Sequence, residues 1–256
     1  MKRNILIVIF LIFTSSIFAQ FPVLLNGQYM TGMVMPHRKG MGNLQNKPVQ
    51  GMELEAGLQM NGNKDWMVTY NQPFVGMGFH YDNLGYPEVL GYAAGLYGFF
   101  ETPVLRRKNY ELMYRLTSGL TYLSKRYIED DNLENIAIST RVNYLFHSGF
   151  RLRYWMSGTT AIGAGIGLTH YSNGAVNKPN KGLNQINIHL GLTNYLKGEY
   201  YEYDDKGRPV PWDPAHETYL LGVFGWTDIG KGFTDNNHPF RNSGTNQTYY
   251  TGGVSL

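Results

Sequence analysis

Residues 109–124 read NYELMYRLTSGLTYLS and alternate between two kinds of side chain. One set of alternate positions is apolar or aromatic: Tyr110, Leu112, Tyr114, Leu116, Leu120 and Tyr122. The other set is charged, polar or small: Glu111, Arg115, Thr117, Gly119 and Thr121. Because successive side chains of a strand point to opposite faces, this period of two predicts a β-strand with one apolar and one polar face.

The same alternation recurs along the chain, for example in GMELEAGLQM (51–60), FVGMGFHY (74–81) and AISTRVNYLFHS (137–148). Charges recur on the polar face: Glu53, Glu55, Glu111, Arg115, Arg141 and His147. A soluble sandwich turns its apolar face inward, whereas a small membrane barrel turns it to lipid and keeps a polar lumen. Alternation alone fits both. Residues 107–124 and 150–171, taken as single strands, exceed the ~5–6 residues usual in soluble sheets and favour the membrane barrel.

The composition supports the same class. The chain has 31 glycines, 20 tyrosines, no cysteine and only 16% charged residues. An exported protein without cysteine has no disulfides, and a helical membrane bundle would be more apolar. The net charge of +3 indicates neither a nucleic acid nor an acidic partner. We therefore expect an all-β protein, an antiparallel transmembrane barrel of about 8–12 strands in the outer membrane of a Gram-negative bacterium.

The chain divides into three predicted parts. Residues 1–19 have the positive start, short apolar core and small residues of a signal peptide cleaved after Ala19; the alternative, a membrane anchor, needs ~20 apolar residues. Residues 20–50 are predicted to be an irregular N-terminal segment, or at most one short strand, because Gly, Pro and Asn interrupt them. Residues 51–256 are predicted to form the barrel. The pattern gives about nine strands, the last at 247–256, and an odd number indicates a merged or missed strand or an incomplete C-terminus.

Residues 165–192, GIGLTHYSNGAVNKPNKGLNQINIHLGL, place polar side chains on an apolar face. His170 and Ser172 continue the row of Ile162, Ala164, Ile166 and Leu168. Asn184, fourteen residues after His170, begins the row of Ile186, Ile188, Leu190 and Leu192. Both rows face lipid in the predicted barrel. The three polar residues are therefore expected to meet on the barrel exterior, near one membrane boundary, across a loop of about ten residues.

These residue types match those needed for acyl transfer. A serine becomes a nucleophile when a base, most often histidine, lies within hydrogen-bond reach, and the second nitrogen of the imidazole must be held. Asn184 can accept that N–H without placing a charge beside lipid. Asn173 and the amide of Gly174 are candidates for stabilising the oxyanion. The alternative is that these are ordinary loop-edge residues of a barrel, since His-x-Ser is a short motif.

The segment HYSN, followed by Pro179, Asn180 and Gly182, resembles the signature of the lipid A 3-O-deacylase (PagL) family of outer-membrane barrels. The resemblance implies a membrane lipid substrate, lipid A, from which an ester-linked acyl chain is removed. It also implies that His170 is the base, Ser172 the nucleophile, and Asn173 and Asn180 the oxyanion-region groups. It implies no cofactor. The family has a glutamate where this chain has Asn184.

Asn184 also gives the chain a second resemblance, to outer-membrane phospholipase A, whose triad is Ser–His–Asn. That family uses calcium, for which Asp204, Asp205 and Asp213 are the acidic candidates here, while the remaining histidines show no metal-ligand spacing. Three hypotheses therefore stand: a lipid A deacylase, a phospholipase A acting on phospholipid, and a non-catalytic structural, adhesion or transport barrel.

Overall fold

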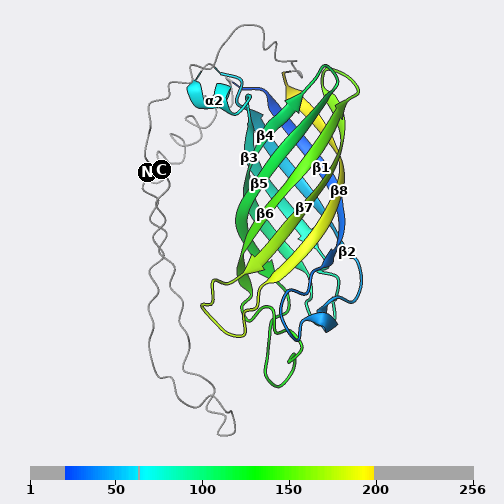
Figure 1. Ribbon diagram of the computed structural model, residues 1–256, viewed down its shortest axis with the longest axis vertical. Coiled ribbons are helices and arrows are strands. Elements are labelled where there is room, and N and C mark those ends of the chain that lie inside the picture. The colour runs from blue at the N-terminus through cyan, green and yellow to red at the C-terminus, as the bar shows by residue number, and fades with distance from the viewer. Residues whose placement is uncertain (1–20, 63, 199–256) are drawn as a thin grey trace, which may run out of the picture. The chain divides into compact units, whose positions relative to one another are not determined.

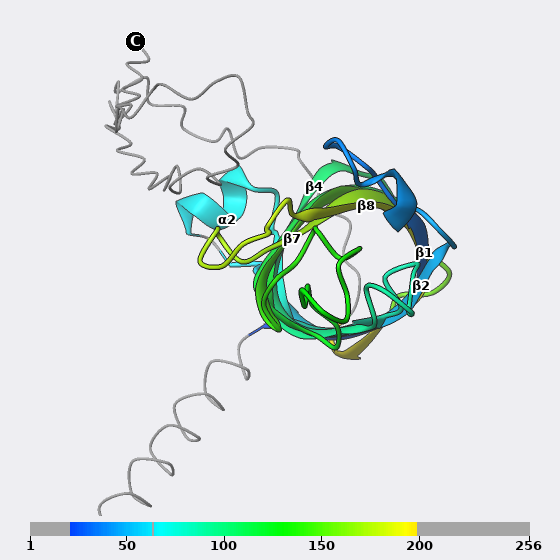
Figure 2. The same ribbon diagram turned by 90° about the horizontal axis from the view of Figure 1, so that it is seen from below.

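The computed structural model describes residues 21–62 and 64–198, which form a closed antiparallel barrel (Figures 1 and 2). Its strands follow chain order around the wall, and β8 pairs with β1 to close it. The strands are β1 (Val23–Val34), β2 (Val49–Gln59), β3 (Phe74–Asp82), β4 (Ala93–Arg106), β5 (Tyr110–Leu123), β6 (Val142–Trp155), β7 (Thr160–Ser172) and β8 (Leu183–Lys197). The short helices are η1 (Gly42–Leu44) and α2 (Asp65–Thr69), and within the described ranges no helix is long and apolar enough to cross a membrane.

The barrel wall has the inverted polarity of a membrane protein. Alternate residues of each strand expose large apolar side chains on the outside, such as Leu54, Met77, Leu96, Leu120 and Leu168. The residues between them point into the lumen and include carboxylates, guanidiniums, histidines and amides. Polar side chains inside and apolar ones outside suit a barrel surrounded by lipid. The prediction of a transmembrane barrel is confirmed.

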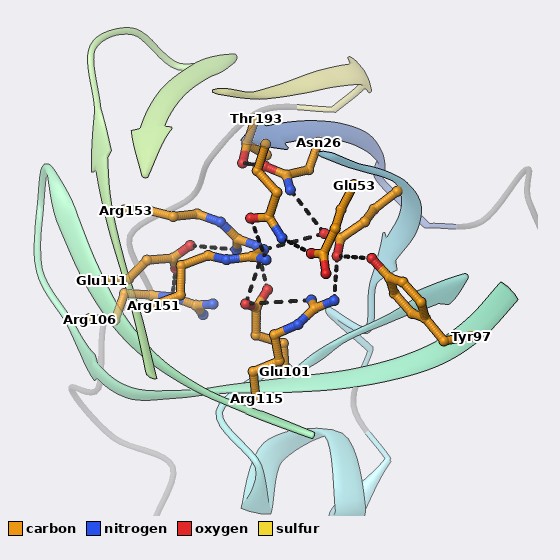
Figure 3. Close-up of polar contacts among 12 residues, drawn as sticks. Asn26, Glu53, Tyr97, Glu101, Arg106, Glu111, Arg115, Arg151, Arg153 and Thr193 are labelled. Atoms are coloured by element: carbon orange, nitrogen blue, oxygen red, sulfur yellow. Dashed lines mark hydrogen bonds and ion pairs between the residues drawn. The ribbon is translucent and has the colours of Figure 1, made fainter. Parts of the chain in front are cut away.

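The lumen is filled by a network of buried charges (Figure 3). Glu55 pairs with Arg115 and Arg151, and Glu101 pairs with Arg151 at 3.2 Å and with Arg153. Glu111 completes the chain of ion pairs, 3.2 Å from Arg153 and 3.1 Å from Arg106. Neutral groups also donate hydrogen bonds to the carboxylates of the network: the hydroxyl of Tyr97 and the amide of Asn26 both donate to Glu55. Buried charges are tolerated only when paired in this way.

The register of the strands is staggered around the barrel. A row of residues directly opposite one another begins at Leu25 of β1 and ends at Asn184 of β8. The carbonyl of Asn184 then accepts the backbone N–H of Met35 at 2.8 Å, ten residues beyond Leu25 on the same strand β1. Such a shear requires tilted strands. As a result, a row that runs across the strands also climbs from one end of the barrel to the other.

The two ends of the barrel differ in their connections. One end carries the segments 35–48, 83–92, 124–141 and 173–182, which lie at the bottom of Figure 1. The other end carries the two tight turns, 107–109 and 156–159, and the segment 60–73 with α2. In outer-membrane barrels the longer loops are extracellular and the short turns periplasmic. This assigns the end with 173–182 to the cell exterior.

Three predicted boundaries are wrong. Residues 20–50 are neither irregular throughout nor limited to a short strand, because the 12 residues Val23–Val34 form β1. Its inward positions include the apolar Leu24, Met30 and Val34, so the strand shows little contrast between its faces. Residues 137–141 are not part of β6, which begins at Val142; Ile138 is buried under the loop segments, 1% exposed.

Residues 150–171 are two strands rather than one. A tight turn at 156–159 separates β6 from β7, and the hydroxyl of Ser157 accepts the backbone N–H groups of Thr159 and Thr160. Trp155 and Ala161, one on each side of the turn, both point inward and pair with each other. The alternation thus stays in phase across the turn and hides it. The barrel formed by residues 21–62 and 64–198 has an even number of strands, whereas the proposed signal peptide and the proposed strand at 247–256 lie outside the described residues.

Candidate active site

The predicted site lies on the outer face of β7 and β8, next to the loop 173–182. His170 is directly opposite Asn184 of β8 on one side and Phe146 of β6 on the other. Ser172 is the last residue of β7 and is directly opposite Tyr144. All of these side chains are partly or fully exposed on the exterior, beside Leu168. The antiparallel register therefore brings together residues from neighbouring strands.

His170 and Asn184 form a short hydrogen bond. The Nδ1 of His170 lies 2.5 Å from the Oδ1 of Asn184. An amide oxygen only accepts, so Nδ1 carries the proton and donates it. In the neutral ring with Nδ1 protonated, Nε2 has the free lone pair, and this is the form of the ring that can take a proton from a hydroxyl.

Ser172 is held by its own loop. Its Oγ accepts hydrogen bonds from the backbone N–H of Gly174 at 3.2 Å and from the Nδ2 of Asn180 at 3.1 Å. Both donors point at the hydroxyl oxygen, so its proton is available to another acceptor. Between residues 21 and 198 no hydrogen bond links His170 to Ser172; the two stand side by side on one face of β7, two residues apart.

The side chain of Asn173 hydrogen-bonds within the loop and to Ser139, and not to the serine hydroxyl. Its side-chain amide donates to the Oγ of Ser139 at 3.1 Å and to the carbonyl of Asn177 at 3.0 Å. Its backbone N–H donates to the Oδ1 of Asn180 at 3.4 Å, which orients the Asn180 amide toward Ser172. Ser139 is a contributor that the sequence pattern did not reveal, because it comes from the distant segment 124–141.

Gly182 also contributes to the site, because its position has no room for a side chain. Its φ is +73°, a conformation that favours glycine, and its N–H donates to the carbonyl of Ala137. A Cβ at this position would lie 2.7 Å from the Cε1 of His170. The absence of a side chain at Gly182 therefore leaves the room that the imidazole occupies.

Neighbouring loops hold the segment 173–182 in place. The Nε2 of His37 lies 2.9 Å from the carbonyl oxygen of Lys181, and the Nζ of Lys181 donates to the carbonyl of Lys39 at 2.7 Å. Of the residues described, no three His, Asp or Glu side chains are grouped so as to hold a metal ion. The calcium candidates Asp204, Asp205 and Asp213 lie outside the described residues.

A profile of the lipid A 3-O-deacylase (PagL) family matches residues 50–193, which covers β2 to β8 almost completely and all the predicted site residues. The chain belongs to the PagL family. PagL-family membership makes it a carboxylic ester hydrolase and places it in the outer membrane of a Gram-negative bacterium.

The chain is also similar to three solved structures. The outer-membrane enzyme PagL is 16% identical with a TM-score of 0.41, covering 65% of this chain and 97% of its own. Neisserial surface protein A is 7% identical with a TM-score of 0.47, covering 67% and 96%. The N-terminal barrel domain of Pseudomonas aeruginosa OprF is 10% identical with a TM-score of 0.36, covering 66% and 96%. No curated protein sequence matches the chain.

Proposed function

We propose that this protein removes an ester-linked fatty acyl chain from lipid A, with Ser172 as the nucleophile and His170 as the general base. The observation that carries the proposal is the 2.5 Å bond from His170 to Asn184, made on the lipid-facing side of the wall beside Ser172. A histidine with one nitrogen held and the other free, next to a serine, is the arrangement that activates a hydroxyl. Membership of the PagL family supports lipid A as the substrate.

The reaction follows from the positions of these groups. When substrate binds, the Nε2 of His170 takes the proton of Ser172, and the serine oxygen attacks the ester carbonyl. The sugar oxygen leaves with the proton from His170, and an acyl-enzyme remains. Water then attacks the acyl carbonyl while His170 takes a proton from it. The bond from the acyl carbon to the serine oxygen breaks, His170 returns the proton to Ser172, and the free fatty acid departs. Apo structures often show such base–nucleophile contacts open, and they tighten around the substrate.

The oxyanion is assigned to two donors of the loop. The N–H of Gly174 and the Nδ2 of Asn180 already lie 3.2 Å and 3.1 Å from the serine oxygen. A tetrahedral intermediate on that oxygen would place its negative oxygen close to the same donors, which act strongly away from bulk water. Asn173 supports this arrangement by holding Asn180.

Asn184 is proposed as the residue that orients the base. A neutral amide fixes the tautomer of His170 but stabilises the imidazolium less than a carboxylate does. In exchange, no unpaired charge lies beside the acyl chains. The site also lies at the end of the barrel that was assigned to the cell exterior. Lipid A is in the outer leaflet, on that same side of the membrane.

Phospholipase A activity is the second candidate. It is favoured by the contact between the Asn184 amide and His170, because Ser–His–Asn is the triad of outer-membrane phospholipase A. Under this alternative the same Ser172 would attack a phospholipid ester.

One comparison tests both candidates. Lipid A is extracted from cells that express the protein or its Ser172→Ala variant, and its mass is measured by mass spectrometry. We expect lipid A from cells with the wild-type protein to lack one acyl chain, and lipid A from cells with the variant to keep it. Calcium-dependent release of fatty acid from phospholipid, with lipid A unchanged, would favour the second candidate. No release from either lipid would contradict the proposed activity.

A further inference from the structure

Tyr171 lies between the two proposed catalytic residues, His170 and Ser172, and points to the opposite face of β7, into the lumen. It is only 1% exposed. Its hydroxyl donates a hydrogen bond to the Oδ2 of Asp82, the last residue of β3, at 3.1 Å. Strands β3 and β7 are four strands apart in either direction around the closed barrel, so this bond joins opposite sides of the wall across the lumen.

The inner face of β7 has few other side chains that could hold the strand. Its inward positions before Tyr171 are Ala161, Gly163, Gly165, Gly167 and Thr169. The hydroxyl of Thr169 lies 2.9 Å from the Nδ1 of His147 on β6 and 3.0 Å from the Nδ2 of Asn187 on β8. Among the described residues, Tyr171 is therefore the only member of β7 whose side chain forms a hydrogen bond to a strand other than its neighbours β6 and β8.

The end of β7 has less support from the sheet than its middle. The pairing between β7 and β8 ends at Tyr171, opposite Leu183, so Ser172 has a partner on β6 alone. Segments with fewer hydrogen bonds and fewer packed side chains open more readily than the centre of a sheet. Glycines weaken a strand further, because they have no side chain to pack. The proposed site therefore lies where β7 depends most on a contact from its inner face.

The partner of Tyr171 is itself held in place. Asp82 is fully buried, and its Oδ1 accepts the backbone N–H of Leu84 at 3.0 Å. The Nδ1 of His80 lies 3.2 Å from the same Oδ2 that Tyr171 contacts. The ring of His80 also stacks on the ring of Tyr171, with centroids 6.0 Å apart. Both the hydroxyl and the ring of Tyr171 are therefore restrained by β3.

We infer that Tyr171 is a positioning residue for the reaction. Through its hydrogen bond to Asp82 it fixes the end of β7 from inside the barrel, and so it holds His170 and Ser172 in place on the lipid-facing side. The inference rests on the proposed function. A small displacement of the base or the nucleophile slows the reaction, because reacting groups must lie within about 3–3.5 Å of each other.

Tyr195 provides a matched comparison at the other end of the barrel. It points into the lumen from β8, is 4% exposed, and donates a hydrogen bond from its hydroxyl to the Oε1 of Gln59 on β2 at 2.7 Å. Its ring stacks on the ring of Trp155, with centroids 5.2 Å apart. Tyr171→Phe and Tyr195→Phe thus each remove one buried hydroxyl from a stacked ring, and only Tyr171 lies next to the proposed site.

The experiment measures the release of fatty acid from lipid A in detergent micelles, over a range of lipid A concentrations, by the wild-type protein and both variants. We expect Tyr171→Phe to lower kcat about tenfold and to leave KM within about twofold, because displaced reacting groups weaken the transition state and not the binding of lipid. Tyr195→Phe should keep both constants within about twofold of wild type, since it is remote from the site. Replacement of Tyr171 by p-aminophenylalanine, which keeps the ring and a donor for Asp82, should restore most of kcat.

Heat-dependent gel migration checks that each variant folds. If Tyr171→Phe does not fold, Asp82→Asn takes its place in the comparison. It replaces the charged acceptor of the Tyr171 hydroxyl by a neutral amide, and because hydrogen bonds to neutral groups are weaker, kcat should fall by about threefold with KM unchanged.

The outcomes separate the two proposals. Wild-type kcat in folded Tyr171→Phe, or in Asp82→Asn where that variant is used, overturns the role of Tyr171 and leaves the proposed function standing. The same holds for a rise in KM alone, for an equal loss of kcat in Tyr195→Phe, and for a loss that p-aminophenylalanine does not restore. Wild-type protein that releases no fatty acid overturns the proposed function, and the positioning role of Tyr171 with it.

Discussion

The lumen and the site beside Ser172 solve the same problem in opposite ways. Both place polar groups in a structure whose outer surroundings are apolar. The lumen uses full charges, with Glu101 contacting Arg151 and Arg153, and every such group is shielded from lipid by the wall. The exterior site has no carboxylate or guanidinium among its hydrogen-bonded groups, which are an imidazole, a hydroxyl and amides. The difference indicates that full charges lie where they can be paired, and that hydrogen bonds of uncharged side chains lie on the lipid-facing side of the wall.

The largest effect is expected at the exterior site, where Ser172→Ala removes the nucleophile. The rate of acyl release should fall by roughly 10³-fold or more, because loss of a nucleophile abolishes the covalent route. Unfolding in urea should be unchanged, since Ser172 is only partly buried at a loop edge. A variant that kept its rate would show that another residue attacks the ester.

A stability effect is expected in the lumen, from Glu101→Leu. The substitution leaves Arg151 and Arg153 without their shared carboxylate. Breaking a buried ion pair in this way should lower the free energy of unfolding by about 3–5 kcal/mol, measured by urea titration in lipid vesicles. Glu88→Gln, at an exposed carboxylate, is the control and should stay near the wild-type value. Unchanged stability of Glu101→Leu would mean that the network does not hold the barrel together.

A smaller kinetic effect is expected from Asn184→Ala, which releases the Nδ1 of His170. Acyl release should fall about 10²-fold, the lower range for disabling a general base, while folding stays intact. Asn184→Glu then asks whether a carboxylate serves better than the amide. Wild-type activity in Asn184→Ala would remove Asn184 from the mechanism.

The smallest effect is expected from substitutions of glycine, which distinguish the cost of an unfavourable φ from a steric clash with His170. Gly182→Ala and Gly174→Ala both place a Cβ at positive φ, +73° and +65°, and each should cost about 1 kcal/mol of stability. Only the Cβ at Gly182 meets the imidazole; at Gly174 no heavy atom lies within 4 Å. Acyl release should therefore fall about tenfold further in Gly182→Ala than in Gly174→Ala, from displacement of the base. Equal rates in the two variants would show that the imidazole does not depend on Gly182.

The sequence predicted most of the wall and failed where its two faces look alike. The alternation in residues 109–124 identified β5, because charges on one face contrast with aromatics on the other. The pattern missed β1, whose inward Leu24 and Met30 remove that contrast. It also merged β6 with β7, because the turn at 156–159 leaves the alternation in phase.

For the candidate site, the sequence alone determined that His170, Ser172 and Asn184 point to lipid, because period-two geometry fixes the face of every residue in a strand. Only the tertiary structure decided that His170 and Asn184 are directly opposite each other and that Ser139 and Gly182 contribute. These relations depend on register and shear, which join segments far apart in the chain. A local pattern carries no information about how far one strand slides along the next.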